Sequence, residues 1–162
     1  MEHLQNTLLY ISPAIIGAVA VRYFVVNNFM FITYRLPATL LHELTHFIAG
    51  LLTNAKPSGA SIIPHKQDDG SWTLGSVTFS NIRWYNGALV GLSPLLLGLI
   101  FVPLIPGEWA FSHTQIKDLW IWLAMAYLFP SAMPSGVDLL IALKSSIPLF
   151  AIAIIGALLY FY

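Results

Sequence analysis

The sequence His42-Glu43-Leu44-Thr45-His46 lies inside a long apolar run, and this placement limits the possible folds more than any other feature. The pattern H-E-x-x-H puts two imidazoles one helical turn apart on the same face of a helix. That spacing allows both to bind one Zn²⁺, with the intervening glutamate beside the metal as a general base. Ionisable side chains are costly in hydrocarbon, so their presence in such a run indicates a functional site.

The composition is typical of an integral membrane protein. Of the 162 residues, 57% are hydrophobic and 9% are charged, whereas about a quarter of a soluble domain is charged. The mean hydropathy is +0.76. A net charge of zero gives no electrostatic basis for binding nucleic acid, and the lack of cysteine excludes disulfides and thiol chemistry. We therefore expect a single membrane-embedded domain that covers residues 1–162.

Five apolar segments are candidates for membrane-spanning helices, since a span needs roughly 20 apolar residues. Their expected limits are 8–26, 36–53, 86–104, 116–143 and 147–162. Pro130 and Pro134 interrupt the fourth segment, which is expected to resume and end before Lys144. The predicted fold class is an all-α multi-pass membrane protein with about five transmembrane helices.

One long polar stretch, 54–85, separates the second and third apolar segments. It contains two β-prone runs on either side of Asp69-Gly70, which predicts a small β-hairpin at the membrane surface. Five crossings would place four basic residues on the side of the membrane that holds this loop, namely Lys56, Lys66, Arg83 and Lys144. The other side would hold three, namely Arg22, Arg35 and Lys117. The positive-inside rule then favours a cytoplasmic hairpin loop.

A catalytic zinc site needs a third protein ligand and an open fourth position. The acidic and imidazole side chains outside the motif that are candidates for this ligand are Asp138, His65, Glu108, His113, Asp118 and His3. Asp138 is favoured because it is the one acidic residue in the apolar sequence after Trp122, and it follows a proline- and glycine-rich break. Broken helices inside membranes occur where they line a cavity. The alternative for Asp138 is that it caps a helix and pairs with Lys144. Asp118 is interpreted separately, as a charge at a helix N-terminus.

These features resemble the site-2 protease family of intramembrane zinc metalloproteases. That family carries H-E-x-x-H on one transmembrane helix and an Asp ligand on a later one, in a motif like N-x-x-P-x-x-x-L-D-G. Here Ser131 stands at the Asn position, Pro134 matches, Asp138 comes one position early and Leu139 replaces the final Gly. The resemblance covers about 36–143, and it implies a core of three helices with a surface β element.

The resemblance implies a zinc-dependent endopeptidase that cleaves a peptide bond in a membrane-anchored protein or peptide within the lipid bilayer. His42, His46 and Asp138 would hold Zn²⁺, which lowers the pKa of water in the fourth position. Glu43 would take the proton of that water and pass it to the leaving amine. We expect such a protein in a bacterial or archaeal cell membrane.

Three polar side chains are candidates for holding the substrate backbone, namely Ser131, Asn81 and Asn86. Two other functions are compatible with the same metal ligands. One is a hydrolase of a small or lipidic substrate, and the other is a non-proteolytic zinc-binding membrane subunit. A closed site with four protein ligands would favour the last of these.

Overall fold

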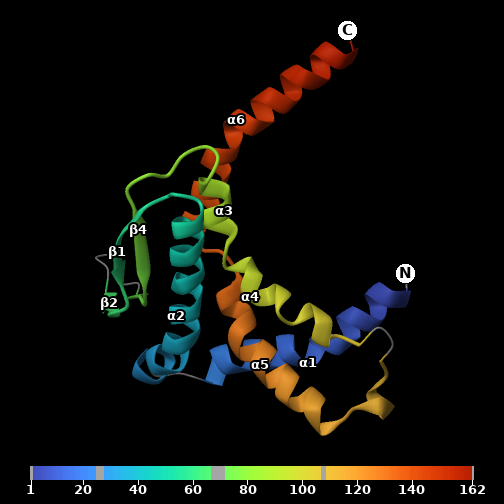
Figure 1. Ribbon diagram of the computed structural model, residues 1–162. Helices are drawn as coiled ribbons and strands as arrows, with labels where there is room; N and C mark the ends of the chain where they lie inside the picture. Colours follow the sequence, from blue (N-terminus) through green and yellow to red (C-terminus); the bar gives the residue numbers. More distant parts are fainter. Residues whose placement is uncertain (1, 25–27, 67–71, 107–108, 162) are drawn as a thin grey trace. The chain divides into compact units, whose positions relative to one another are not determined.

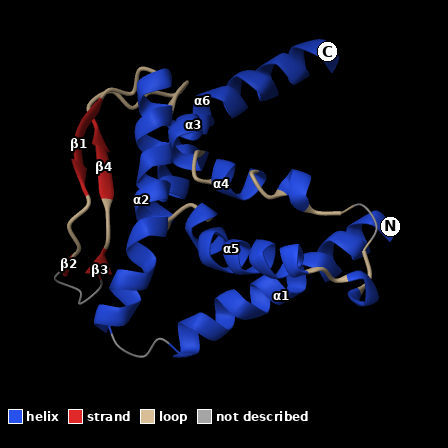
Figure 2. Ribbon diagram, turned by 60° about the horizontal axis from the view of Figure 1, so that its bottom comes forward, coloured by secondary structure: helices blue, strands red, loops and turns tan. Residues whose placement is uncertain are grey.

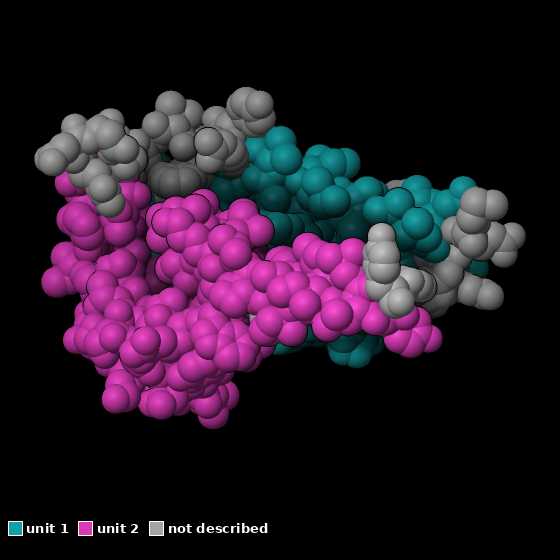
Figure 3. All heavy atoms as spheres, turned by 90° about the horizontal axis from the view of Figure 1, so that it is seen from above, with its two compact units in different colours: residues 1–39, 95–133 teal, residues 40–94, 134–162 magenta. Residues whose placement is uncertain are grey.

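The computed structural model describes residues 2–24, 28–66, 72–106 and 109–161 (Figure 1). They form two compact units, coloured separately in Figure 3: unit 1 contains Met1–Thr39 and Leu95–Met133, and unit 2 contains Leu40–Pro94 and Pro134–Tyr162. The elements in chain order are α1 (Glu2–Phe24), α2 (Asn28–Leu52), β1 (Pro57–Ser61), β2 (His65–Lys66), β3 (Trp72–Thr73), β4 (Ser76–Phe79), α3 (Gly87–Leu92), α4 (Leu95–Leu99), η1 (Val102–Leu104), η2 (Phe111–His113), α5 (Ile116–Ala132) and α6 (Gly136–Phe161).

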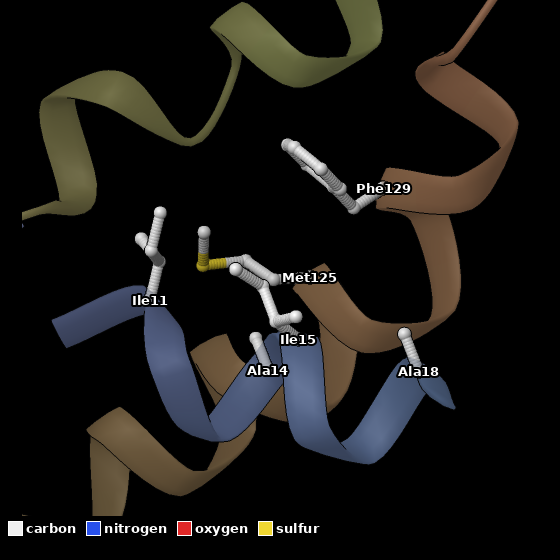
Figure 4. A pocket seen from close by; sticks show the side chains of 6 residues that line it. All are labelled: Ile11, Ala14, Ile15, Ala18, Met125 and Phe129. Atoms are coloured by element: carbon white, nitrogen blue, oxygen red, sulfur yellow. The ribbon is translucent and has the colours of Figure 1, made fainter. Parts of the chain in front are cut away.

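Unit 1 is built on the packing of α1 against α5. An aromatic cluster connects them, in which the ring of Tyr10 lies 5.4 Å from that of Trp109 and 5.7 Å from that of Trp122. Next to it, the two helices enclose a small cavity lined only by apolar side chains (Figure 4). These are Ile11, Ala14, Ile15, Ala18, Met125 and Phe129.

Unit 2 contains the β-strands, drawn in red in Figure 2. β1 pairs antiparallel with β4, and β2 pairs antiparallel with β3. The antiparallel pairing expected within 54–85 is therefore present, as two short ladders with Ser61 opposite Ser76 and His65 opposite Thr73. The expected turn at Asp69-Gly70 lies outside the described residues.

The same unit contains the close packing of α3 against α6. Gly87 and Gly91 on α3 are buried, and so are Ala142 and Ser145 on α6. Small residues one turn apart on facing helices let two backbones approach closely. This packing brings the first turn of α6 against α3.

The prediction of five transmembrane helices is wrong. Within the described residues, two helical segments are long and apolar enough to cross a membrane, namely Leu4–Val21 in α1 and Gly136–Tyr160 in α6. The segment expected at 36–53 corresponds to the second half of α2, which ends at Leu52, and the polar residues from His42 to His46 lower its hydropathy. The segment expected at 86–104 is divided at Ser93 and Pro94 into the short helices α3 and α4.

The fourth and fifth segments were also divided at the wrong place. α5 ends at Ala132 after 17 residues, and Met133 has an extended backbone (φ −77°, ψ 125°), as expected for a residue before a proline. α6 begins at Gly136 and continues through Pro148 for 26 residues. The helix break therefore lies at 133–135, and no break occurs near Lys144.

Candidate metal centre

α2 supplies two imidazoles, because His42 and His46 lie one turn apart on the same face. Their Nε2 atoms are 3.2 Å apart, and the rings meet edge to face with centroids 4.8 Å apart. His46 is buried, and the side chain of His42 is 13% exposed. The two rings therefore present one nitrogen each to a common, largely enclosed point.

α6 supplies a carboxylate to the same point. Asp138 is the third residue of this helix, and its Oδ2 accepts a hydrogen bond of 2.7 Å from the backbone N–H of Ser135. The Oγ of Ser135 accepts in turn from the backbone N–H of Asp138, which completes a capping box. Oδ1 lies 3.1 Å from His46 Nε2, and Oδ2 lies 3.4 Å from His42 Nε2.

The spacing of these three groups would allow them to share one metal ion. Two ligand atoms bound to one tetrahedral Zn²⁺ at 2.0–2.1 Å lie about 3.3–3.4 Å apart. The two Nε2 atoms are 3.2 Å apart, and each lies 3.1 or 3.4 Å from a different oxygen of Asp138. One ligand atom from each of the three residues gives a set whose members lie within 4.8 Å of one another. Within the described part of the chain, His42, His46 and Asp138 are the one group of three side chains that could hold a metal ion. Three protein ligands leave a position for water or substrate, as in catalytic zinc sites.

The orientation of His46 is set by α3. Its Nδ1 donates a hydrogen bond of 2.8 Å to the backbone carbonyl of Val90, which leaves the lone pair of Nε2 directed at the metal position. The hydroxyl of Ser93 donates to the same carbonyl at 2.8 Å and lies 3.2 Å from Nδ1. Sequence reasoning missed Val90 and Ser93, because a backbone carbonyl gives no signal in the sequence.

Glu43 follows His42 on α2 and is half-buried. α2 is not one of the two candidate membrane spans. Burial raises the pKa of Glu43, and the nearby Asp138 raises it further, whereas His42 and His46 lower it. A carboxylate beside a metal position can serve as a general base for a bound water.

Asn86 and Asn81 stabilise the connection between the hairpin and α3. Asn86 is fully buried; its Nδ2 donates to the carbonyls of Thr53 and Asn81, and its Oδ1 accepts from the backbone N–H of Arg83. Asn81 donates to the carbonyl of Asn54 at 2.7 Å. Both amides are occupied by contacts within the fold, whereas they were expected to hold a substrate.

Ser131 and Asp118 both lie on α5 in unit 1, whereas the three candidate metal ligands belong to unit 2. Ser131 is buried, with 4% of its surface exposed. Asp118 forms a capping box at the start of α5 and accepts a hydrogen bond from the hydroxyl of Tyr10. The interpretation of Asp118 as a charge at a helix N-terminus is confirmed.

The remaining candidates for the third ligand are not part of the cluster that the described residues form. His65 is exposed on β2, and His113 is exposed as the last residue of η2. Glu108 and the side chain of His3 fall outside the described residues.

Comparisons with protein families, with curated proteins and with solved structures found no match to the chain. The resemblance to site-2 proteases therefore depends on features of this chain, chiefly the H-E-x-x-H motif and the segment from Ser131 to Asp138.

Proposed function

We propose that this protein is a zinc-dependent endopeptidase that hydrolyses a peptide bond in a membrane-anchored substrate. The observation that carries the proposal is the convergence of His42 Nε2, His46 Nε2 and the Asp138 carboxylate, whose nearest atoms are 3.1–3.4 Å apart. Two imidazoles and a carboxylate are a ligand set that zinc prefers. The position of Glu43 directly after His42 adds the general base that metallopeptidases with this motif require.

The protein's own groups have distinct roles in the proposed reaction. When bound, zinc supplies Lewis-acid polarisation of a carbonyl group and makes a water molecule more acidic. Glu43 accepts the proton of the attacking water and delivers it to the nitrogen of the leaving amine. Val90 holds His46 in the tautomer that a metal needs, and the Ser135 cap holds the carboxylate of Asp138.

Two apolar helices support a membrane-anchored substrate and a bilayer environment. The segment Gly136–Tyr160 of α6 has a mean hydropathy of 2.1, and only 12% of it is buried. The distal side chains of Ile147, Ile154 and Leu159 are 60–77% exposed, and such an apolar surface favours contact with lipid. Asp138 lies in the first turn of this segment, so the proposed metal site is near one end of a candidate span.

The proposal predicts that Glu43→Gln retains zinc and loses turnover. The full chain, purified in detergent, would be incubated with a quenched fluorescent peptide attached to a membrane anchor. We expect turnover to fall by more than about 100-fold, because general-base catalysis is worth that much or more. His65→Ala removes an exposed histidine outside the cluster and serves as the matched control with unchanged turnover. Full turnover by Glu43→Gln would exclude this residue as the base.

The same assay distinguishes the other two functions that the ligands allow. Cleavage of an ester or another small substrate, dependent on Glu43 and without peptide cleavage, would establish a hydrolase of a lipidic or small substrate. Zinc at one ion per chain without hydrolysis of either kind would establish a non-proteolytic zinc-binding subunit.

A further inference from the structure

α3 contacts both of the helices that carry the metal ligands. The carbonyl of Val90 accepts a hydrogen bond from His46 on α2. The next residue, Gly91, is buried against the backbone of Asp138 on α6. α3 therefore orients the imidazole of His46 through Val90 and contacts the backbone of Asp138 through Gly91.

Gly91 allows an approach that no other residue would permit. A Cβ at this position would overlap the carbonyl oxygen of Asp138, and it would lie 3.2 Å from both the Cβ and the backbone nitrogen of Ala142. Backbone atoms cannot rotate out of the way as a side chain can, so α6 would have to shift. By contrast, a Cβ at Gly136 or at Gly156 on α6 would have no atom within 4 Å.

We propose that Gly91 is a positioning residue for the metal ligand Asp138. Because Gly91 has no side chain, α6 lies close enough for its carboxylate to reach both imidazoles at 3.1 and 3.4 Å. Metal–ligand distances tolerate deviations of only about 0.2 Å, so a small shift of α6 weakens binding. This inference rests on the proposed zinc site and concerns the backbone that supports it.

Gly87 lies one helical turn before Gly91 and meets a different kind of neighbour. A Cβ at Gly87 would lie 2.7 Å from the Cβ of Ser145 and would overlap its Oγ. Both atoms belong to one side chain, and the third neighbour is the Cγ2 of Ile82 at 3.2 Å. A smaller residue at position 145 therefore removes the two closest contacts. The two glycines therefore allow a comparison between a backbone contact near the ligand and a side-chain contact farther along α6.

The first test is the zinc affinity of the full chain in detergent, measured by competition with a chromophoric chelator. We expect Gly91→Ala to bind zinc at least about tenfold more weakly than wild type, in the range found for groups that orient metal ligands. Gly136→Ala and Gly156→Ala are the matched controls on α6, with unchanged affinity. Cobalt-loaded Gly91→Ala should also lose the strong visible absorption of a tetrahedral site, which the controls retain.

A double-mutant cycle separates positioning from a general loss of stability. Asp138→Glu lengthens the carboxylate by one methylene and weakens binding in the wild-type background. In Gly91→Ala the longer side chain compensates for the displaced helix. The double variant should therefore bind zinc at least about threefold more tightly than the product of the two single losses predicts. If the zinc affinity of the double variant equals the product of the two single losses, the proposal is overturned.

Unchanged zinc affinity in a folded Gly91→Ala protein would also overturn it, while leaving the zinc site and the proposed function intact. If Gly91→Ala does not fold, Gly87→Ala tests the same spacing of α3 and α6 one turn away. We expect it to bind zinc more weakly than wild type, and Ser145→Gly to restore the affinity. Unchanged zinc affinity of a folded Gly87→Ala protein would overturn the proposal. Absence of zinc binding by wild type would instead overturn the proposed function, and the inference with it.

Discussion

α5 and α6 begin in the same way, with an aspartate as the third helical residue of a capping box. In α5, Oδ2 of Asp118 accepts a hydrogen bond of 2.7 Å from the backbone N–H of Gln115. In α6, Oδ2 of Asp138 accepts one of the same length from the backbone N–H of Ser135. Locally, the two carboxylates satisfy the same orphan donor at a helix N-terminus.

The two carboxylates differ in what faces them from the neighbouring helix. Asp118 accepts a hydrogen bond of 3.0 Å from the hydroxyl of Tyr10, within the aromatic cluster of unit 1. Asp138 faces the Nε2 atoms of His42 and His46. The capping box thus fixes where a carboxylate lies, and the facing helix decides whether it meets a core hydroxyl or the two imidazoles of the candidate metal site.

The largest expected difference between the two sites is in zinc affinity. Asp138→Asn keeps an oxygen for the helix cap and removes the anionic ligand, so we expect zinc affinity to fall by more than about 100-fold, beyond the range for residues that only orient ligands. Asp118→Asn is the matched control in the other capping box and should bind zinc as wild type does. Chelator competition measures both. Equal losses in the two variants would remove the distinction between the sites.

The second expected difference is in stability. Asp118→Ala leaves the fully buried hydroxyl of Tyr10 without its acceptor and removes a helix cap. We expect the free energy of unfolding to fall by about 2–4 kcal/mol, from an orphaned hydroxyl (about 1–3) and a lost cap (about 1). Unfolding in denaturant, followed through the fluorescence of Trp109 and Trp122, measures the change. Zinc affinity should be unaffected, and a loss of zinc would show that Asp118 contributes to the metal site.

The smallest expected effects come from the capping partners. Ser135→Ala removes the Oγ that accepts from Asp138 N–H and should cost about 1 kcal/mol of stability. Zinc affinity should fall by less than about tenfold, because the carboxylate keeps its bond to the backbone N–H of position 135. Gln115→Ala makes the corresponding change in α5 and should not alter zinc affinity. Greater zinc loss from Ser135→Ala than from Asp138→Asn would reverse the assigned roles.

Part of the candidate metal site could be predicted from the sequence. The spacing of His42 and His46 fixes their common face once the segment is a helix, and Glu43 follows from the same motif. Asp138 was recognised from the break before it and from the resemblance to site-2 proteases. Its capping role had been considered an alternative to metal binding, but its carboxylate caps α6 and faces the histidines at once.

The supporting contacts could not be predicted, because they involve backbone atoms on a distant segment. The Val90 carbonyl that orients His46 and the Asp138 carbonyl that faces Gly91 depend on how α3 packs in unit 2. Nothing in local spacing specifies these contacts. The same limit applies to the hydrogen bonds that Asn81 and Asn86 make to backbone carbonyls within the fold, while their expected contact with a substrate stays a prediction.

The positions of the helix ends were harder to predict than the hairpin. Alternation of β-prone residues was sufficient to locate strand pairing within 54–85. Prolines gave no comparable rule, since Pro148 lies inside α6 while Pro134 lies in the break before it. A proline removes one helical hydrogen bond, and whether the helix continues depends on packing that the sequence pattern does not contain. The number of spans was therefore overestimated.

The most direct test of this account is the zinc content of the purified full chain, for wild type beside His46→Ala, Asp138→Ala and Asp118→Ala. The account predicts about one zinc ion per chain in wild type and in Asp118→Ala, and loss of zinc in the other two variants. Wild-type protein that contains no zinc and takes up none on addition would contradict the metal site. Zinc retained at one ion per chain in Asp138→Ala would contradict the role of α6 as the source of the third ligand.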